Sequence, residues 1–296
     1  MWTAQPSART VLGAAVLTAL SCAPARGQTV GVRAQGMGGA FTGVADDASA
    51  VYWNPAGLAS GAYFSGVVDF NSLGTPSDSA DHHDSSAALV SFALPVLGFS
   101  YYRTASQTVP SDRVVAHHAG VTVDQSLWGG LTAGATFEAV HGTVNGFGST
   151  KFDMNVGVME SGDVGRIGFA IRNLLQPTFA APGQGARLDR QMRVGGSLNL
   201  SDATLIAADA DLTKTLAASS RERRDAAVGV ERRLSPKGVV RGGLHWNTAG
   251  GGAGLAPEGS VGASYAVYGR TRADAQLTFG SKNGDRGWGI GLSMVF

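Results

Sequence analysis

Two histidine-containing runs carry residue types that bind metal ions. They are Asp81-His82-His83-Asp84 and His117-His118. Neighbouring residues of an extended chain point to opposite sides, so neither run gathers its ligands at one point. We therefore expect a solvated loop at the first run, a histidine on each face of one strand at the second, and no metal site.

The run from Gly36 to Gly43 is glycine-rich, as are loops that cradle phosphate. It follows no predicted strand, and it lacks both the P-loop lysine and the third glycine at the spacing of a dinucleotide fingerprint. The chain has no G-x-S-x-G elbow, and no local spacing sets a serine against a histidine. The sequence therefore predicts no catalytic residues, no cofactor and no enzyme activity.

The first residues have the pattern of a secretory signal. Arg9 precedes an apolar run over 11–20, and Ala25-Arg26-Gly27 offers a cleavage site, which predicts a signal peptide over 1–27. The single cysteine, Cys22, lies in this segment and follows Leu20-Ser21, which resembles a lipobox, so lipidation at Cys22 stays an alternative to cleavage. No later run is apolar for the 18 residues that a transmembrane helix needs.

Composition narrows the class of fold and partner. The chain has 23 basic and 22 acidic side chains without a cluster of like charge, which argues against a nucleic-acid partner. Its 43 glycines in 296 residues are about twice the usual share but follow no G-X-Y period. This composition favours many short strands joined by tight turns.

From Tyr63 onward, apolar residues alternate with small or polar ones, which is typical of strands. In the clearest stretch, 131–139, Leu131 and Phe137 share one face while Thr136 and Glu138 share the other. The pattern predicts fourteen strands, at 63–71, 87–94, 97–104, 113–125, 128–141, 151–160, 164–173, 190–200, 203–213, 225–234, 239–247, 258–268, 271–280 and 286–296.

The predicted connections alternate in length, as in bacterial outer-membrane barrels, where short periplasmic turns alternate with longer external loops. The tight ones lie at 95–96, 125–127, 161–163, 201–202, 235–238 and 269–270, and the extended ones near 72–86, 105–112, 142–150, 174–189, 214–224 and 248–257. The second face of the strands would then line the lumen, with charged residues at Glu138, Asp153, Arg172, Arg193, Asp209, Asp211, Glu231, Arg241, Arg272 and Asp274.

The final strand runs from Trp288 to Phe296, with alternate apolar residues and a terminal aromatic. It resembles the signal that the barrel assembly machinery reads in outer-membrane proteins. Trp128, Trp246 and Tyr268 also fall at strand ends, where aromatic side chains suit membrane interfaces. We therefore predict an all-β transmembrane antiparallel barrel of about fourteen strands over 61–296, surrounded by outer-membrane lipid. A soluble β-sandwich or repeat array is the alternative.

Residues 31–60 do not alternate. Asp46-Asp47 suits the start of a short helix, and the turn-forming run Asn54-Pro55-Ala56-Gly57 suits its end. These residues, together with Gly38, Gly39 and Phe41, resemble the N-terminal hatch of the FadL-type outer-membrane transporters of hydrophobic compounds. The same signature resembles the PorV/PorQ-like proteins of outer-membrane secretion systems.

This resemblance implies a cell outer-membrane location, a fourteen-stranded barrel and a hatch or plug over 28–60. It implies passive transport or binding of small hydrophobic compounds or, as the alternative, a role as a component or scaffold of a secretion system with protein partners. The predicted external loops are short for a large hydrophobic collecting surface, which argues against fatty-acid uptake in particular.

A fourteen-stranded barrel is wider than its own side chains can fill, so its lumen must be an aqueous channel or be plugged. The segment before the first strand fits as the plug. Its apolar residues would line a ligand path or pack the plug against the wall: Met37, Phe41, Val51, Tyr52, Trp53 and Leu58. We expect Asp46 and Asp47 to pair with lumenal arginines such as Arg172, Arg193, Arg241 and Arg272, because buried charges need partners.

Overall fold

The computed structural model describes residues 30–74, 83–108, 112–181, 184–216, 222–249, 257–280 and 285–296. The expected signal peptide over 1–27, with the lipidation candidate Cys22, lies outside the described residues. Asp81 and His82 of the first histidine run lie outside them too.

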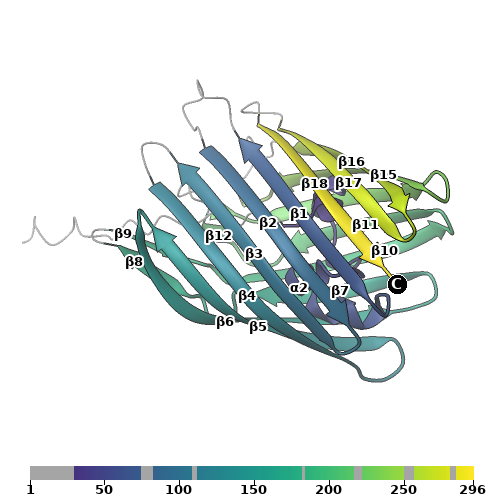
Figure 1. Ribbon diagram of the computed structural model, residues 1–296, viewed down its shortest axis with the longest axis horizontal. Helices are drawn as coiled ribbons and strands as arrows, with labels where there is room; N and C mark the ends of the chain where they lie inside the picture. Colours follow the sequence, from purple (N-terminus) through teal and green to yellow (C-terminus); the bar gives the residue numbers. More distant parts are fainter. Residues whose placement is uncertain are drawn as a thin grey trace, which may run out of the picture.

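Fourteen strands of the described residues form a closed antiparallel barrel in which each strand pairs with the next along the chain (Figure 1). The first and last strands close it in one continuous register, from Ser65 opposite Val295 to Gly74 opposite Arg286. The predicted fold class is confirmed. The barrel strands are β1 (Ser65–Gly74), β2 (His83–Leu94), β3 (Leu97–Thr108), β4 (Asp112–Ser126), β5 (Leu131–Val144), β6 (Phe147–Ser161), β7 (Gly165–Arg172), β10 (Gln191–Ser201), β11 (Thr204–Asp211), β14 (Asp225–Arg233), β15 (Gly238–Asn247), β16 (Glu258–Tyr268), β17 (Thr271–Gly280) and β18 (Arg286–Val295).

Two of the extended connections contain small hairpins. One is formed by β8 (Thr178–Ala181) and β9 (Gln184–Arg187), the other by β12 (Thr215–Leu216) and β13 (Glu222–Arg223). Phe179 of the first hairpin is buried against the inner face of β4 and β5, among Val114, Val140 and Gly142. This hairpin therefore folds back over the lumenal face of the wall.

The extended connection predicted at 142–150 is wrong. Strands β5 and β6 continue to a two-residue turn at Asn145 and Gly146, whose φ angles are 48° and 88°. An Asn-Gly pair with positive φ at both residues forms a hairpin turn whose twist matches that of the strands. The pairing can therefore run unbroken to Val144 and Phe147.

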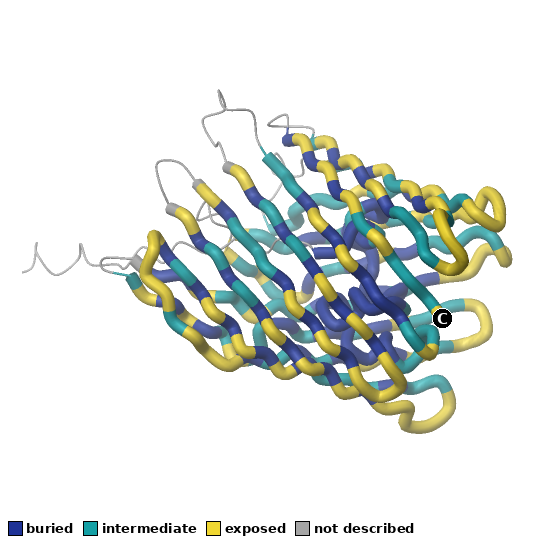
Figure 2. Tube along the Cα trace, viewed as in Figure 1, coloured by how far each residue is buried: buried dark blue, intermediate teal, exposed yellow. Residues whose placement is uncertain are grey.

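Buried and exposed residues alternate along the barrel strands (Figure 2). Successive side chains therefore point alternately into the lumen and to the outside of the barrel. Outward apolar residues such as Phe137 and Ile290 are 42% and 56% exposed, whereas inward Glu138 and Asp153 are fully buried. The charged residues predicted to face inward are all buried or half-buried. An apolar exterior around a polar interior is the pattern of a barrel embedded in lipid. None of the described helices has the length and apolar character needed to cross a membrane.

The second histidine run divides as expected. His118 lies inside the barrel and is 3% exposed, whereas His117 faces outward beside the Tyr101 hydroxyl, 2.7 Å away. The two imidazole rings therefore lie in different environments, one in the lumen and one on the outer face of the barrel.

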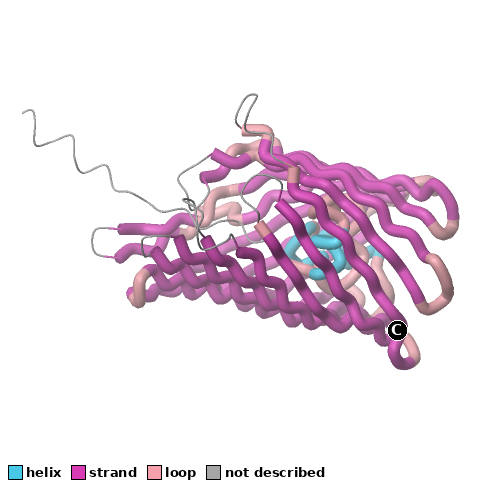
Figure 3. The backbone as a smooth tube through the Cα atoms, turned by 90° about the horizontal axis from the view of Figure 1, so that it is seen from above, coloured by secondary structure: helices cyan, strands magenta, loops and turns pink. Residues whose placement is uncertain are grey.

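The segment before β1 lies inside the barrel, where Figure 3 shows its helices enclosed by strands. It contains α1 (Val32–Gly36), α2 (Ala50–Trp53) and the 3₁₀ helix η1 (Pro55–Ser60). Helix α1 contacts β15 to β18 and β1, while η1 contacts β4, β5 and β6 across the lumen. The predicted turn chemistry ends α2, because Asn54 is extended and its side chain accepts a hydrogen bond from the Ala56 N–H at 3.2 Å.

A charge in the middle of the outer face should destabilise the barrel in lipid. Ile290 lies at the midpoint of β18 and faces outward, so Ile290→Arg should cost about 2–4 kcal/mol of unfolding free energy. Tyr268→Arg, at the end of β16, should cost about 0–1 kcal/mol, because a charge near the interface stays hydrated. Denaturant unfolding in phospholipid vesicles measures both, and equal costs would contradict a membrane-spanning orientation.

Candidate functional site

Residues 30–60, called the hatch below, carry an apolar core. The six apolar residues singled out in the sequence are all buried, at 8% exposure or less. They pack on one another and on inward wall residues such as Val67, Leu89 and Tyr102. The Trp53 ring meets Phe41 edge-on, with centroids 5.9 Å apart, and its indole N–H donates to the Val30 carbonyl at 2.9 Å. The core thus forms an apolar layer across the lumen.

Inward glycines of the strands allow the hatch backbone to lie directly against the wall. A Cβ at Gly243 would be 2.1 Å from the Met37 carbonyl carbon, and one at Gly134 would be 2.5 Å from that of Pro55. Such distances leave no room for any side chain at these positions. The strand glycines whose added Cβ would meet the hatch are called the wall glycines below: Gly98, Gly134, Gly157, Gly168, Gly195, Gly229, Gly243, Gly262 and Gly289.

Two glycines of the hatch motif also lie too close to other backbone atoms to carry a side chain. Gly38 has a φ of 67°, and a Cβ there would lie 2.8 Å from the Leu244 nitrogen of β15. A Cβ at Gly57 would lie 2.0 Å from the Ala45 carbonyl oxygen within the hatch. Gly38 therefore needs to be glycine for both its backbone conformation and its close approach, whereas Gly57 needs to be glycine for close approach alone.

Lumenal side chains satisfy much of the hatch backbone. Asp69 accepts a hydrogen bond from the Val32 N–H at 2.9 Å, and Asp209 accepts from the N–H groups of Phe41 and Thr42 at 3.0 and 2.9 Å. On the donor side, wall hydroxyls and a guanidinium bond to hatch carbonyls: Ser197 to Gly43, Thr132 to Ala56, Thr136 to Val51 and Arg193 to Gly39. The wall therefore supplies the partners that short helices cannot provide for their own backbone.

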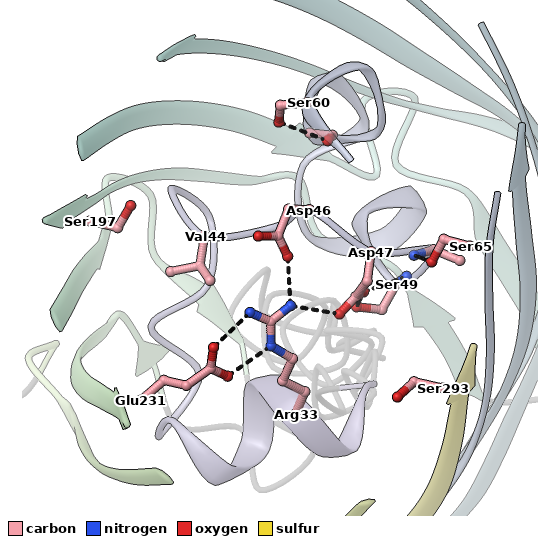
Figure 4. Close-up of polar contacts among 12 residues, drawn as sticks. Arg33, Val44, Asp46, Asp47, Ser49, Ser60, Ser65, Ser197, Glu231 and Ser293 are labelled. Atoms are coloured by element: carbon pink, nitrogen blue, oxygen red, sulfur yellow. Dashed lines mark hydrogen bonds and ion pairs between the residues drawn. The ribbon is translucent and has the colours of Figure 1, made fainter. Parts of the chain in front are cut away.

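The principal ion-pair centre is Arg33 in α1 (Figure 4). Its Nη1 lies 2.5 Å from Asp46 and 3.0 Å from Asp47, and its Nε lies 2.9 Å from Glu231 of β14. Arg241 of β15 also bonds to Glu231, at 2.6 Å. Arg33 thus joins helix α1 to the middle of the hatch and both to the wall.

The predicted partners of Asp46 and Asp47 are therefore wrong. Both carboxylates are neutralised mainly from within the hatch by Arg33, and the wall arginine near Asp46 is Arg166, at 3.5 Å. Three of the four predicted arginines have other partners: Arg193 pairs with Asp209 and Asp211, Arg241 with Glu231, and Arg172 lies over the Tyr52 ring. Arg33 precedes the quoted motif, so the sequence pattern did not draw attention to it.

Two polar cavities lie on either side of α1. The larger, of about 340 Å³, is bordered by Arg33, Asp46, Glu231 and Arg272 and reaches Val295, the last residue of β18. The smaller, of about 50 Å³, is bordered by Gln35, Asn71, His245 and Gln276. The hatch separates these two polar spaces.

The glycine-rich composition predicts tight turns, but it does not predict the wall glycines. Some glycines do sit in turns with positive φ, such as Gly129, Gly146 and Gly269. The wall glycines instead lie within strands on the inward face. The sequence signal for them is that they occupy the inward positions of the strand alternation. Gly134, for example, shares a face with Thr132, Thr136 and Glu138, which are all buried.

A methyl group on a wall glycine should displace the hatch. Gly243→Ala forces a Cβ into the Met37 backbone, so the variant should conduct severalfold more current than the parent in planar bilayers. Gly242→Ala is the matched control, because it lies next along β15 and its Cβ would meet no atom closer than 3.9 Å. Unchanged conductance in Gly243→Ala would argue against the hatch as the element that closes the lumen.

Loss of Arg33 should loosen the hatch more than loss of either aspartate. Arg33→Met leaves Asp46, Asp47 and Glu231 without their shared cation, at a cost of about 2 kcal/mol in hatch docking. Proteolysis of the hatch in the assembled barrel measures this effect. Asp46→Asn is the comparison and should accelerate cleavage less, because the other two carboxylates keep their partner. Equal protection of Arg33→Met and the parent would contradict the role of Arg33.

Comparisons with known proteins agree with this architecture. No protein-family model and no curated protein matches the sequence. Among solved structures, the CymD monoaromatic hydrocarbon channel superposes with a TM-score of 0.68 at 15% identity, over 90% of this chain and 97% of that one. The toluene transporter TodX of Pseudomonas putida gives 0.67 at 12% identity, over 92% and 98% of the two chains. A FadL homologue of Pseudomonas aeruginosa gives 0.64 at 12% identity, over 92% and 99%. The chain thus has the fold of the FadL-type outer-membrane barrels, as the hatch resemblance implied.

Proposed function

We propose that this protein is an outer-membrane channel that binds small hydrophobic compounds and passes them through a lumen closed by the hatch. The observation that carries the proposal is the apolar core of the hatch, which spans the lumen of a barrel whose fold is that of hydrocarbon channels. The names of the CymD and TodX structures describe a monoaromatic hydrocarbon channel and a toluene transporter.

The physical basis for this proposal is the layered polarity of the lumen. The cavities on either side of α1 are polar, whereas the layer that contains Phe41, Trp53 and Leu58 is apolar. Transfer of a neutral hydrophobic compound from water into such a layer lowers its free energy, whereas transfer of an ion raises its free energy because the ion loses hydration. Movement of the hatch is required, because the layer is fully packed in the closed state.

One observation favours a second function, that of a scaffold in a secretion system. The hatch backbone lies against the wall glycines and is bonded to lumenal side chains on several strands. A plug held at so many points suits a sealed barrel that presents its rims to a protein partner. The two functions differ in whether the hatch must move.

A disulfide lock of the hatch separates these functions. The Val32 Cγ2 atom is 3.1 Å from the position that a Cβ would take at Gly289, so Val32→Cys with Gly289→Cys brings two sulfurs within bonding reach once the Asn71 side chain shifts. The lock is made in a Cys22→Ser background, since Cys22 is the single natural cysteine. Toluene uptake is measured in proteoliposomes whose outer leaflet contains lipopolysaccharide.

For a channel, the reduced variant should take up toluene faster than empty vesicles, and oxidation should abolish the difference. The Val32→Cys single variant is the control and should not respond to oxidation. Uptake equal to that of empty vesicles in both redox states would overturn the channel and leave the scaffold.

A further inference from the structure

The inner wall of the barrel contains an aromatic and cationic cage around the ring of Tyr52. The cage is formed by Tyr102 of β3 and Arg172 of β7, with Trp53 of the hatch beside them. The Tyr52 and Tyr102 rings meet edge-on, with centroids 5.5 Å apart and an interplanar angle of 86°. The Arg172 guanidinium lies over the face of the Tyr52 ring, with its Cζ 4.2 Å from the centroid.

The wall half of this cage is held rigidly by Glu138. This carboxylate is fully buried and accepts hydrogen bonds from the Tyr102 hydroxyl at 3.0 and 3.1 Å and from the Asn155 amide at 2.9 Å. His118 lies 3.0 Å from the same carboxylate and stacks on the Tyr102 ring at 4.1 Å. Tyr102 is thus fixed from two sides, independently of the hatch.

The cation of the cage retains unused bonding capacity. Arg172 is 6% exposed, and one amino group bonds to Gln191, but its buried Nη1 has no hydrogen-bond partner among the described residues. A buried guanidinium without a full set of acceptors is costly unless its charge is met by other means. The π face of the ring that it covers provides part of that compensation.

We propose that Tyr102 and Arg172 form a binding site for one aromatic ring, and that Tyr52 of the hatch occupies this site in the closed state. The ligands are neutral monoaromatic compounds, including phenols, whose ring hydroxyl offers an acceptor to Arg172. The proposal rests on the proposed channel function and names its substrate class and site. When the hatch moves, Tyr52 leaves the cage and a substrate ring takes its place.

The test empties the cage while leaving the hatch in position. Tyr52→Ala in lipid nanodiscs is titrated calorimetrically with phenol and with cyclohexanol, which has similar size but no π face. Tyr52→Phe retains the ring and serves as the blank for partition into lipid. Tyr52→Ala should bind phenol about tenfold more tightly than cyclohexanol. The Arg172 guanidinium and the edge of the Tyr102 ring attract the π face of phenol, and cyclohexanol has no π face.

A second engineered cavity tests whether phenol binds preferentially to any cavity of similar size. Phe179→Ala opens a site lined by aliphatic residues such as Val114 and Val140, which should bind the two alcohols with similar affinity. Adding Arg172→Gln to Tyr52→Ala should remove the preference for phenol. The gel mobility of unboiled samples verifies that each variant is a folded barrel.

Equal affinity for the two alcohols in folded Tyr52→Ala, no binding of either, or a phenol preference that survives Arg172→Gln would each overturn the cage. If any of these results is found together with toluene uptake by the reduced lock variant, the channel function is supported and only the proposed aromatic site is rejected. Absence of uptake together with a phenol preference would instead keep the cage and reject the channel.

Discussion

The width of a fourteen-stranded barrel is the constraint on which the other features of this protein depend. Side chains alone cannot fill such a lumen, so a separate segment of chain must occupy it or water will. The hatch contains only short helices, and much of its backbone has no partner within its own structure. The inner wall must therefore offer both space and hydrogen-bonding groups at defined heights.

Glycines and polar side chains of the strands divide these two tasks. Glycines such as Gly134 and Gly243 remove side-chain volume where the hatch backbone lies closest, and residues such as Asp69 and Asp209 supply acceptors beside them. Both kinds of residue share the inward face, which explains why that face is small and polar while the outer face is apolar. The wall is thus shaped to one backbone path, which favours a single seated position of the hatch.

Two of the lumenal charge centres show contrasting ways of stabilising buried charge. Arg33 gathers Asp46, Asp47 and Glu231 near the larger polar cavity, where water reaches the group and limits its desolvation. Glu138 lies on the other side of the hatch core, fully buried, and relies on Tyr102, His118 and Asn155 instead of water. The first centre fixes hatch to wall, whereas the second organises the wall itself.

The sequence by itself determined the strands and their inward and outward faces, because period-two alternation and turn chemistry are local properties of the chain. The hatch was expected from the resemblance of residues 38–57 to a known family and from the width of the barrel. The sequence-based prediction misplaced the connection at 142–150 by overlooking the Asn145-Gly146 turn signal, which is also local. Only the tertiary structure decided the partners of Asp46 and Asp47 and the purpose of the inward glycines. Arg33 and the wall arginines are equally cationic in the sequence, and their distances from the two carboxylates follow from how the hatch folds back on itself inside the barrel. The role of an inward glycine likewise depends on which backbone segment packs against it. That segment is far away in the sequence, so the contact is visible only in the folded structure.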